Sequence, residues 1–167
     1  MAYHPRLSKH KSHATVTSVA QLLYLSTDVT KIVIDNGMSE SGVTRFDLSG
    51  FSRLKRLEIG SDCFSYVEEL RLIGLSELES VEIEMNSFTQ YKNTYHITAD
   101  PNRHFYLKDC PKLKSLKMGR YSFSDYTVIE IEDVDALEVI EMGDLNEYSY
   151  VFYYASLELK SILIQNE

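Results

Sequence analysis

A short apolar motif recurs along the chain, and this recurrence constrains the fold more than any other feature. The motif has the form L-x-x-L-x-I, and it is clearest at Leu54, Leu57 and Ile59. Six copies begin 25, 24, 35, 24 and 22 residues apart, at Val29, Leu54, Leu78, Leu113, Leu137 and Leu159. Such self-similarity predicts a repeat architecture, in which each unit buries its apolar side chains against the next unit.

A second apolar row precedes each motif. Its copies are Phe46, Leu48 and Phe51; Leu70, Leu72 and Leu75; Phe105, Leu107 and Cys110; Ile129, Ile131 and Val134; and, more weakly, Val151 and Tyr153. Alternation with a period of two residues predicts short strands with one buried face. Glycine or aspartate lies between the two rows of most units, where the chain must turn a corner. We therefore predict an all-β or nearly all-β solenoid of about six coils with parallel strands.

Glycine and phenylalanine extend the repeated unit. Glycine follows the motif at Gly60, Gly119 and Gly143, and phenylalanine lies ten residues after the anchor at Phe64, Phe88 and Phe123. With these additions the unit resembles the leucine-rich repeats, and it is most similar to their helix-poor, BspA-like type. The resemblance covers about Ala20 to Gln165, but glycine stands where most leucine-rich repeats place asparagine. It implies a protein-recognition or adhesion module and transfers no catalytic residues.

Two segments fall outside the regular spacing. Residues 1–19 are predicted to form a basic polar tail or an N-terminal cap, and residues 20–167 the leucine-rich-repeat solenoid. The 35-residue step indicates an insertion at about 91–103, and solenoid insertions form loops that often lie on a binding face. Its contact-prone members are Tyr95, His96, Asp100, Asn102 and Arg103. An unspecialised surface loop is the alternative interpretation.

Charge and cysteine content restrict the partners and the compartment. The net charge is -8, with +3 in residues 1–20 and -11 in residues 21–167, so nucleic acid is not an expected partner. Cys63 and Cys110 are too few for a disulfide framework, and we expect both to be reduced. We expect no cofactor. We also expect no membrane span, because no apolar stretch is long enough to cross a membrane. A cytoplasmic location is the default, and a cell-surface location follows if a signal peptide was removed.

Outward-facing side chains of the second strand in each unit are candidate partner-binding residues, because inward-facing ones form the core. These candidates are Arg56, Glu58, Glu82, Lys117 and Glu141. The alternative interpretation is a solvated sheet face whose charges compensate one another.

Aromatic residues mark the outward face of the first strand toward the C-terminus. The predicted outward row is Asp47, Arg71, Tyr106, Glu130 and Phe152. The segment EYSYVFYYA places Tyr150, Phe152 and Tyr154 outward if Val151 and Tyr153 point inward. Exposed aromatic side chains at this density indicate binding or self-association. A shift of register by one residue, or rings that cap the core, would remove that indication.

These features favour a non-enzymatic protein–protein interaction module, which binds through the outward strand positions and the inserted loop. The alternative is a self-assembling structural or adhesive surface protein, a homo-oligomer joined through an open C-terminal edge where Leu163 faces outward. A hydrolase or metal enzyme has little support, because no Ser/His/Asp or Cys/His signature and no glycine-rich phosphate loop is legible. His10 and His13 have a metal-ligand spacing but no acidic or cysteine partner nearby.

Overall fold

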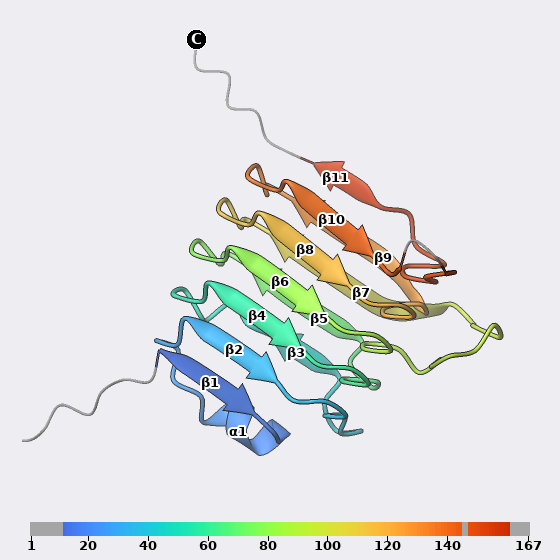
Figure 1. Ribbon diagram of the computed structural model, residues 1–167, viewed down its shortest axis with the longest axis horizontal. Coiled ribbons are helices and arrows are strands. Elements are labelled where there is room, and N and C mark those ends of the chain that lie inside the picture. The colour runs from blue at the N-terminus through green and yellow to red at the C-terminus, as the bar shows by residue number, and fades with distance from the viewer. Residues whose placement is uncertain (1–11, 145–146, 161–167) are drawn as a thin grey trace, which may run out of the picture.

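The computed structural model describes residues 12–144 and 147–160, and this part of the chain consists of two parallel β-sheets (Figure 1). Sheet A contains β1 (His13–Val16), β2 (Lys31–Ile34), β4 (Arg56–Ile59), β6 (Ser80–Ile83), β8 (Ser115–Met118) and β10 (Val139–Met142), in that order. Sheet B contains β3 (Arg45–Asp47), β5 (Glu69–Ile73), β7 (Asp100–Lys108), β9 (Tyr126–Glu132) and β11 (Glu158–Lys160). From β2 to β9 the chain alternates between the sheets at every step. The prediction of a nearly all-β fold with parallel strands is confirmed.

Helix is confined to one short segment of the described residues, α1 (Val19–Leu23), at the N-terminal end. It follows β1, which pairs with β2 so that His13 lies beside Lys31. The Gln21 side-chain carbonyl accepts a hydrogen bond of 2.7 Å from the Thr17 amide and fixes the start of the helix. Residues 1–11, which carry the basic side chains of the predicted N-terminal tail or cap, lie outside the described residues.

Equivalent residues of successive units are neighbours in the sheets. In sheet A, Leu57 pairs with Val81 and Val81 with Leu116, and all three side chains are buried. In sheet B, Leu70 pairs with Phe105 in the same way. Because strand side chains alternate, each apolar row faces the interior and the residues between face solvent. Both sheets contribute to one core cluster.

Phenylalanines form a continuous row through this core. Ring centroids are 4.5 Å apart between Phe46 and Phe64, 5.1 Å between Phe64 and Phe88, and 4.8 Å between Phe88 and Phe123. Phe152 extends the row, with its ring 5.1 Å from that of Phe123. The prediction that Phe152 faces outward is therefore wrong, because this residue continues the Phe64–Phe88–Phe123 series and is buried.

The C-terminal strand assignment also changes. Residues 151–154 form a turn, so Val151 and Tyr153 do not continue a strand row, and Tyr153 is exposed. Leu159 pairs with Ile131 in sheet B, and not with the second-strand row of sheet A as its sequence motif predicted. The remaining members of that last motif lie outside the described residues.

Small polar residues before the phenylalanines form a second row, made of hydrogen bonds. The Ser87 hydroxyl donates to the Gly60 carbonyl at 2.8 Å, and the Ser122 hydroxyl donates to the Glu84 carbonyl at 2.8 Å. The Cys63 thiol makes the equivalent contact to the Asp35 carbonyl at 3.1 Å. Each hydroxyl also accepts from the preceding unit, since the Cys63 amide donates to Ser87 and the Ser87 amide to Ser122. This row satisfies buried corner groups that would otherwise lack partners.

Two glycines at this corner are required by close packing. A Cβ at Gly60 would lie 2.9 Å from the Asn36 amide nitrogen, and one at Gly119 would lie 2.4 Å from the Met85 amide nitrogen. Both distances are shorter than van der Waals contact, so any side chain there would force the corners of adjacent units apart.

The prediction that Arg103 is a contact-prone loop residue is wrong, because its side chain is fully buried. The inserted loop ends at residue 99, and Asp100 already belongs to β7. The Arg103 guanidinium donates to the Ser65 carbonyl at 2.6 Å, and its Nε lies 3.4 Å from a carboxylate oxygen of Asp125. Burial raises the pKa of Asp125, and the Arg103 charge opposes that rise. The pair is a buried structural link between β7 and the start of β9.

Candidate interaction surfaces

The outward face of sheet A carries the predicted row of charged side chains. Glu58 lies beside Glu82, Glu82 beside Lys117, and Lys117 beside Glu141. Lys31 pairs with Glu58 at 2.6 Å and Lys117 with Glu141 at 3.3 Å. With Arg56 exposed at the edge of the same face, the surface is polar and largely compensated within itself.

The outward face of sheet B is compensated more completely. Arg71 contacts Asp47 at 3.5 Å and Glu69 at 3.1 Å. Lys108 pairs with Glu130, and this hydrogen bond raises the pKa of Lys108 and lowers that of Glu130. Between the two groups lies Tyr106, 5.4 Å from the Arg71 guanidinium and 5.5 Å from the Lys108 ammonium. The Tyr106 ring thus already makes cation–π contacts with two side chains of its own sheet.

Six tyrosines gather at the side of the molecule where the sheet A strands end. We call Tyr95, Tyr121, Tyr148, Tyr150, Tyr153 and Tyr154 the tyrosine cluster. Tyr150 lies at its centre, with ring centroids 5.3 Å from Tyr121, 5.5 Å from Tyr153 and 5.9 Å from Tyr95. Tyr148 is 79% exposed and Tyr95 75% exposed. The cluster therefore combines a partly buried centre with an exposed aromatic rim.

The tyrosine cluster joins two segments that are far apart in the sequence. Tyr95 comes from the inserted loop, and the Tyr154 hydroxyl donates to the Ile97 carbonyl in that loop at 2.7 Å. On the other side the Tyr121 amide donates to the Ser149 carbonyl at 2.7 Å. The structure thus brings together the inserted loop and the aromatic segment. The exposed His96 lies in the same loop, whereas Tyr106 lies apart on sheet B.

Arg120 places a cation against this cluster. Its guanidinium lies 5.4 Å from the Tyr121 ring centroid, forms an ion pair with Glu147, and donates to the Tyr148 carbonyl at 3.3 Å. These contacts tie Glu147 and Tyr148 to the corner after β8. By restraining the backbone at Tyr148, they reduce the conformational entropy that this residue would lose on binding a partner.

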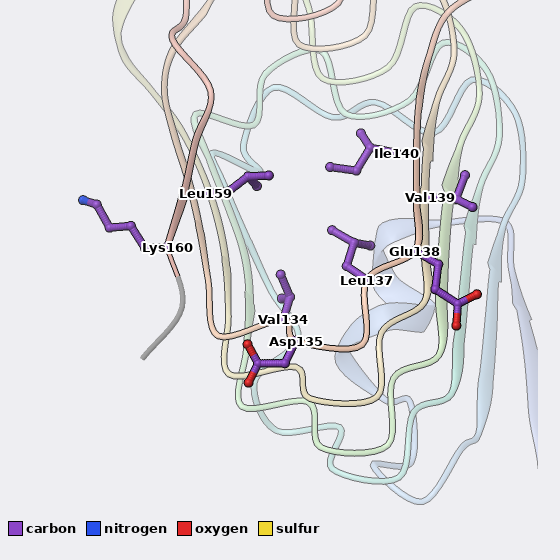
Figure 2. Close-up of a pocket in the computed structure, with 8 residues that line it drawn as sticks. All are labelled: Val134, Asp135, Leu137, Glu138, Val139, Ile140, Leu159 and Lys160. Carbon is purple, nitrogen blue, oxygen red and sulfur yellow. The ribbon is translucent and has the colours of Figure 1, made fainter. Parts of the chain in front are cut away.

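Among the described residues, the interior opens to solvent beside β10 and β11. A hollow of about 310 Å³ lies there. Leu137, Ile140 and Leu159 project into it (Figure 2). The corresponding core residues of the preceding unit are fully buried, yet here Leu159 is 57% exposed and Met142 is 44% exposed. Asp135 and Glu138 line the same hollow. Leu163, which the sequence placed at this open edge, lies outside the described residues.

Across residues 12–144 and 147–160, no group of three or more histidine, cysteine, aspartate or glutamate side chains could hold a metal ion. No helix in this part of the chain is long and apolar enough to cross a membrane. Cys63 and Cys110 are free and buried, and burial raises the pKa of Cys110 to about 11.

Comparison with known proteins gives no relative: no family model, no curated protein and no solved structure matches the chain. We therefore infer function from the geometry and chemistry of this chain alone.

Proposed function

We propose that the chain is a leucine-rich-repeat solenoid of about six coils that acts as a non-enzymatic protein–protein interaction module. The parallel sheets and the pairing of equivalent residues from successive units support the solenoid. The partner binds at the tyrosine cluster, with the outward row of sheet A as a polar extension. The observation that carries this proposal is the exposure of Tyr95, Tyr148, Tyr153 and Tyr154 in one connected group.

Tyrosine suits this role for physical reasons. Its ring buries a large area while losing few rotatable bonds, and its hydroxyl keeps the surface soluble in the absence of a partner. Binding energy at protein interfaces concentrates in such side chains. By contrast, the charged side chains of sheet B already pair with one another, so a partner gains little by replacing those contacts.

Affinity purification with the full chain as bait tests the proposal. Compared with the wild type, the double variant Tyr148→Ser, Tyr153→Ser should lose at least about tenfold of any specifically captured protein, a loss of about 1.4 kcal/mol. Tyr24→Ser is the matched control, because Tyr24 is 88% exposed in the N-terminal segment. Both changes affect exposed rings and should alter stability by no more than about 0.5 kcal/mol. Equal capture by the wild type and the double variant would contradict binding at the cluster.

A second candidate function is self-assembly as a structural or adhesive surface protein. The hollow at the C-terminal end favours it, because apolar side chains such as Ile140 and Leu159 are open to solvent beside the edge strands β10 and β11. Unpaired strand edges and exposed apolar side chains both promote association with another chain.

A further inference from the structure

We infer that the partner of the tyrosine cluster is a basic protein segment, whose arginine side chains stack on the exposed rings. The inference rests on the proposed function, binding at that cluster, and adds the chemistry of the partner. Three observations support it: the cations that tyrosine rings already bind within the molecule, the exposed rings that have no such cation, and two carboxylates beside the cluster that no base of the described residues neutralises.

Tyrosine rings receive every cation–π contact of the described residues, and arginine supplies the cation in most of these contacts. At the tyrosine cluster itself, the Arg120 guanidinium lies 5.4 Å from the centroid of the Tyr121 ring. A guanidinium is planar and weakly hydrated, so it stacks on an aromatic ring more readily than an ammonium group does. This is the contact that an arginine of the partner repeats at the exposed rings.

The exposed rings of the cluster have no cation from the chain itself. Tyr95, Tyr148 and Tyr153 are exposed, and no basic side chain of the described residues lies over any of the three rings. The face of an aromatic ring carries partial negative charge, which attracts a cation. The three rings therefore offer the kind of surface that Arg120 occupies at Tyr121.

Two carboxylates on the outward face of sheet A determine the sign of the partner's charge. Glu82 and Glu84 line two adjoining hollows of this face, one of about 330 Å³ and one of about 350 Å³. Both side chains are exposed, and the Ser61 hydroxyl donates to Glu84 at 2.8 Å. Among the described residues, the bases of this face pair with Glu58 and Glu141, and none forms an ion pair with Glu82 or Glu84.

The larger of these hollows adjoins the tyrosine cluster at Gly143. Gly119 and Gly143 line this hollow. Ser149, which stands between Tyr148 and Tyr150, packs directly on Gly143, since a Cβ there would lie 3.0 Å from the Ser149 Cα. One extended segment of a partner can therefore contact the exposed rings and the two carboxylates together.

Net charge favours the same partner. Residues 12–144 and 147–160 contain 14 bases and 24 acids, a net charge of -10. Such a surface attracts a basic partner and repels an acidic one. Charge thus selects a basic segment, and stacking on tyrosine rings selects arginine over lysine within it.

A nona-arginine peptide with a fluorescent label tests the inference, and nona-lysine is the probe of equal charge. Fluorescence anisotropy with the full chain should show tighter binding of nona-arginine by about threefold or more, because guanidinium groups stack on the rings. The variant Tyr148→Ser, Tyr153→Ser should weaken nona-arginine binding about tenfold and nona-lysine binding less. Tyr24→Ser, which changes an exposed ring in the N-terminal segment, should leave both affinities unchanged.

A second pair of variants tests the role of the carboxylates. Glu82→Gln, Glu84→Gln should weaken binding of both peptides about fivefold or more at low salt, and less at high salt. The matched control is Glu77→Gln, Glu79→Gln, which removes the same charge from the corner before β6, where these acids pair with Lys112 and Lys55. This control should change either affinity by less than about twofold.

The outcomes separate the inference from the function on which it rests. Equal binding of the two peptides, unchanged in the tyrosine variant, would overturn the inference, because charge alone would then explain binding. If nona-arginine does not bind but Tyr148→Ser, Tyr153→Ser loses a captured protein, the partner is not basic and the tyrosine cluster remains its binding site. If the tyrosine variant changes neither capture nor peptide binding, the inference and the proposed site are both wrong. Equal effects of the two glutamine variants would overturn the contact with Glu82 and Glu84.

Discussion

Apolar side chains at equivalent positions are more exposed at the C-terminal end of the molecule than in its middle. Met118 in β8 is 2% exposed, whereas its register partner Met142 in β10 is 44% exposed. Leu116 is fully buried, whereas its partner Ile140 is only partly buried. The residue types are nearly the same in each pair, so the difference arises from the neighbours. Ile140 and Met142 lie on β10, the last strand of sheet A, so no further strand of the described residues covers them as β10 covers Leu116 and Met118.

The polar row changes between the same two regions. Ser122 stands directly before Phe123 and donates to the Glu84 carbonyl, whereas Val151 stands directly before Phe152 and has no side-chain donor. Aromatic contacts among Tyr121, Tyr150 and Tyr153 occupy this corner of the molecule instead. The middle units are thus held by specific buried hydrogen bonds, and the last one is held by contacts that leave large rings exposed.

Replacing Arg103 should give the largest loss of stability. Arg103→Met leaves the Asp125 carboxylate buried without its cation, and we expect the free energy of unfolding to fall by about 3–5 kcal/mol. Urea unfolding followed by circular dichroism measures this loss. Arg56→Met, at an exposed position of sheet A, is the control and should change stability by no more than about 0.5 kcal/mol. Equal effects of the two changes would mean that the Arg103 pair contributes nothing in the middle region.

The pH dependence of the Arg103→Met variant gives a further check on that cause. The pKa of Asp125 is already raised by burial, and removing Arg103 raises it more. The folded state then binds a proton that the unfolded state releases, so stability increases as the pH falls toward the folded-state pKa. The loss of stability caused by Arg103→Met should therefore be smaller at about pH 5 than at about pH 8.

Truncation of one register pair compares the two regions directly. Leu116→Ala should lower the free energy of unfolding by about 2–5 kcal/mol, because it opens a cavity in a closed core. Ile140→Ala should cost less than about 2 kcal/mol, because water already reaches this side chain through the hollow. Denaturant titrations of both variants at low protein concentration measure the two losses of unfolding free energy. Equal losses would show that the C-terminal hollow is covered in solution.

The polar row should give a smaller effect. Ser122→Ala removes the donor to the Glu84 carbonyl and the acceptor for the Ser87 amide, both buried, at an expected cost of about 1–3 kcal/mol. Ser80→Ala, at an outward position of β6, should stay within about 0.5 kcal/mol of the wild type. Thermal unfolding of the two variants side by side measures the difference. A Ser122→Ala variant as stable as Ser80→Ala would show that the row is dispensable.

The sequence was sufficient to predict most of the strands, because their period-two alternation determines which side chains face inward. It predicted Leu57, Leu72 and Leu116 as core residues, and it predicted Glu58 and Lys117 as outward ones. The sequence also shows that Cys63, Ser87 and Ser122 each stand directly before a phenylalanine of the row. Its hydrogen bonds to the corner carbonyls were not, since they depend on the position of the preceding unit.

The errors have two physical origins. Phe64 and Phe123 lie four residues after a glycine, but Phe152 lies nine residues after Gly143. Because of this difference in spacing, the sequence pattern did not identify Phe152 as the next member of the phenylalanine row. Arg103 was misassigned because the partner that permits its burial, Asp125, is twenty-two residues away. The contact between Tyr95 and Tyr150 is likewise a tertiary contact between two loops. Local periodicity carries no information about such contacts.

Both irregular lengths occur between the end of a sheet A strand and the strand of sheet B that follows. The inserted loop lies between Phe88 and β7, and the five extra residues lie between Gly143 and Phe152. In both places the phenylalanine row continues and the strands keep their parallel partners. The corner thus acts as a permissive site, at which chain length varies without disturbing the core. A foreign peptide grafted into the loop near Asn93 would be displayed beside the aromatic rim on an otherwise unchanged support.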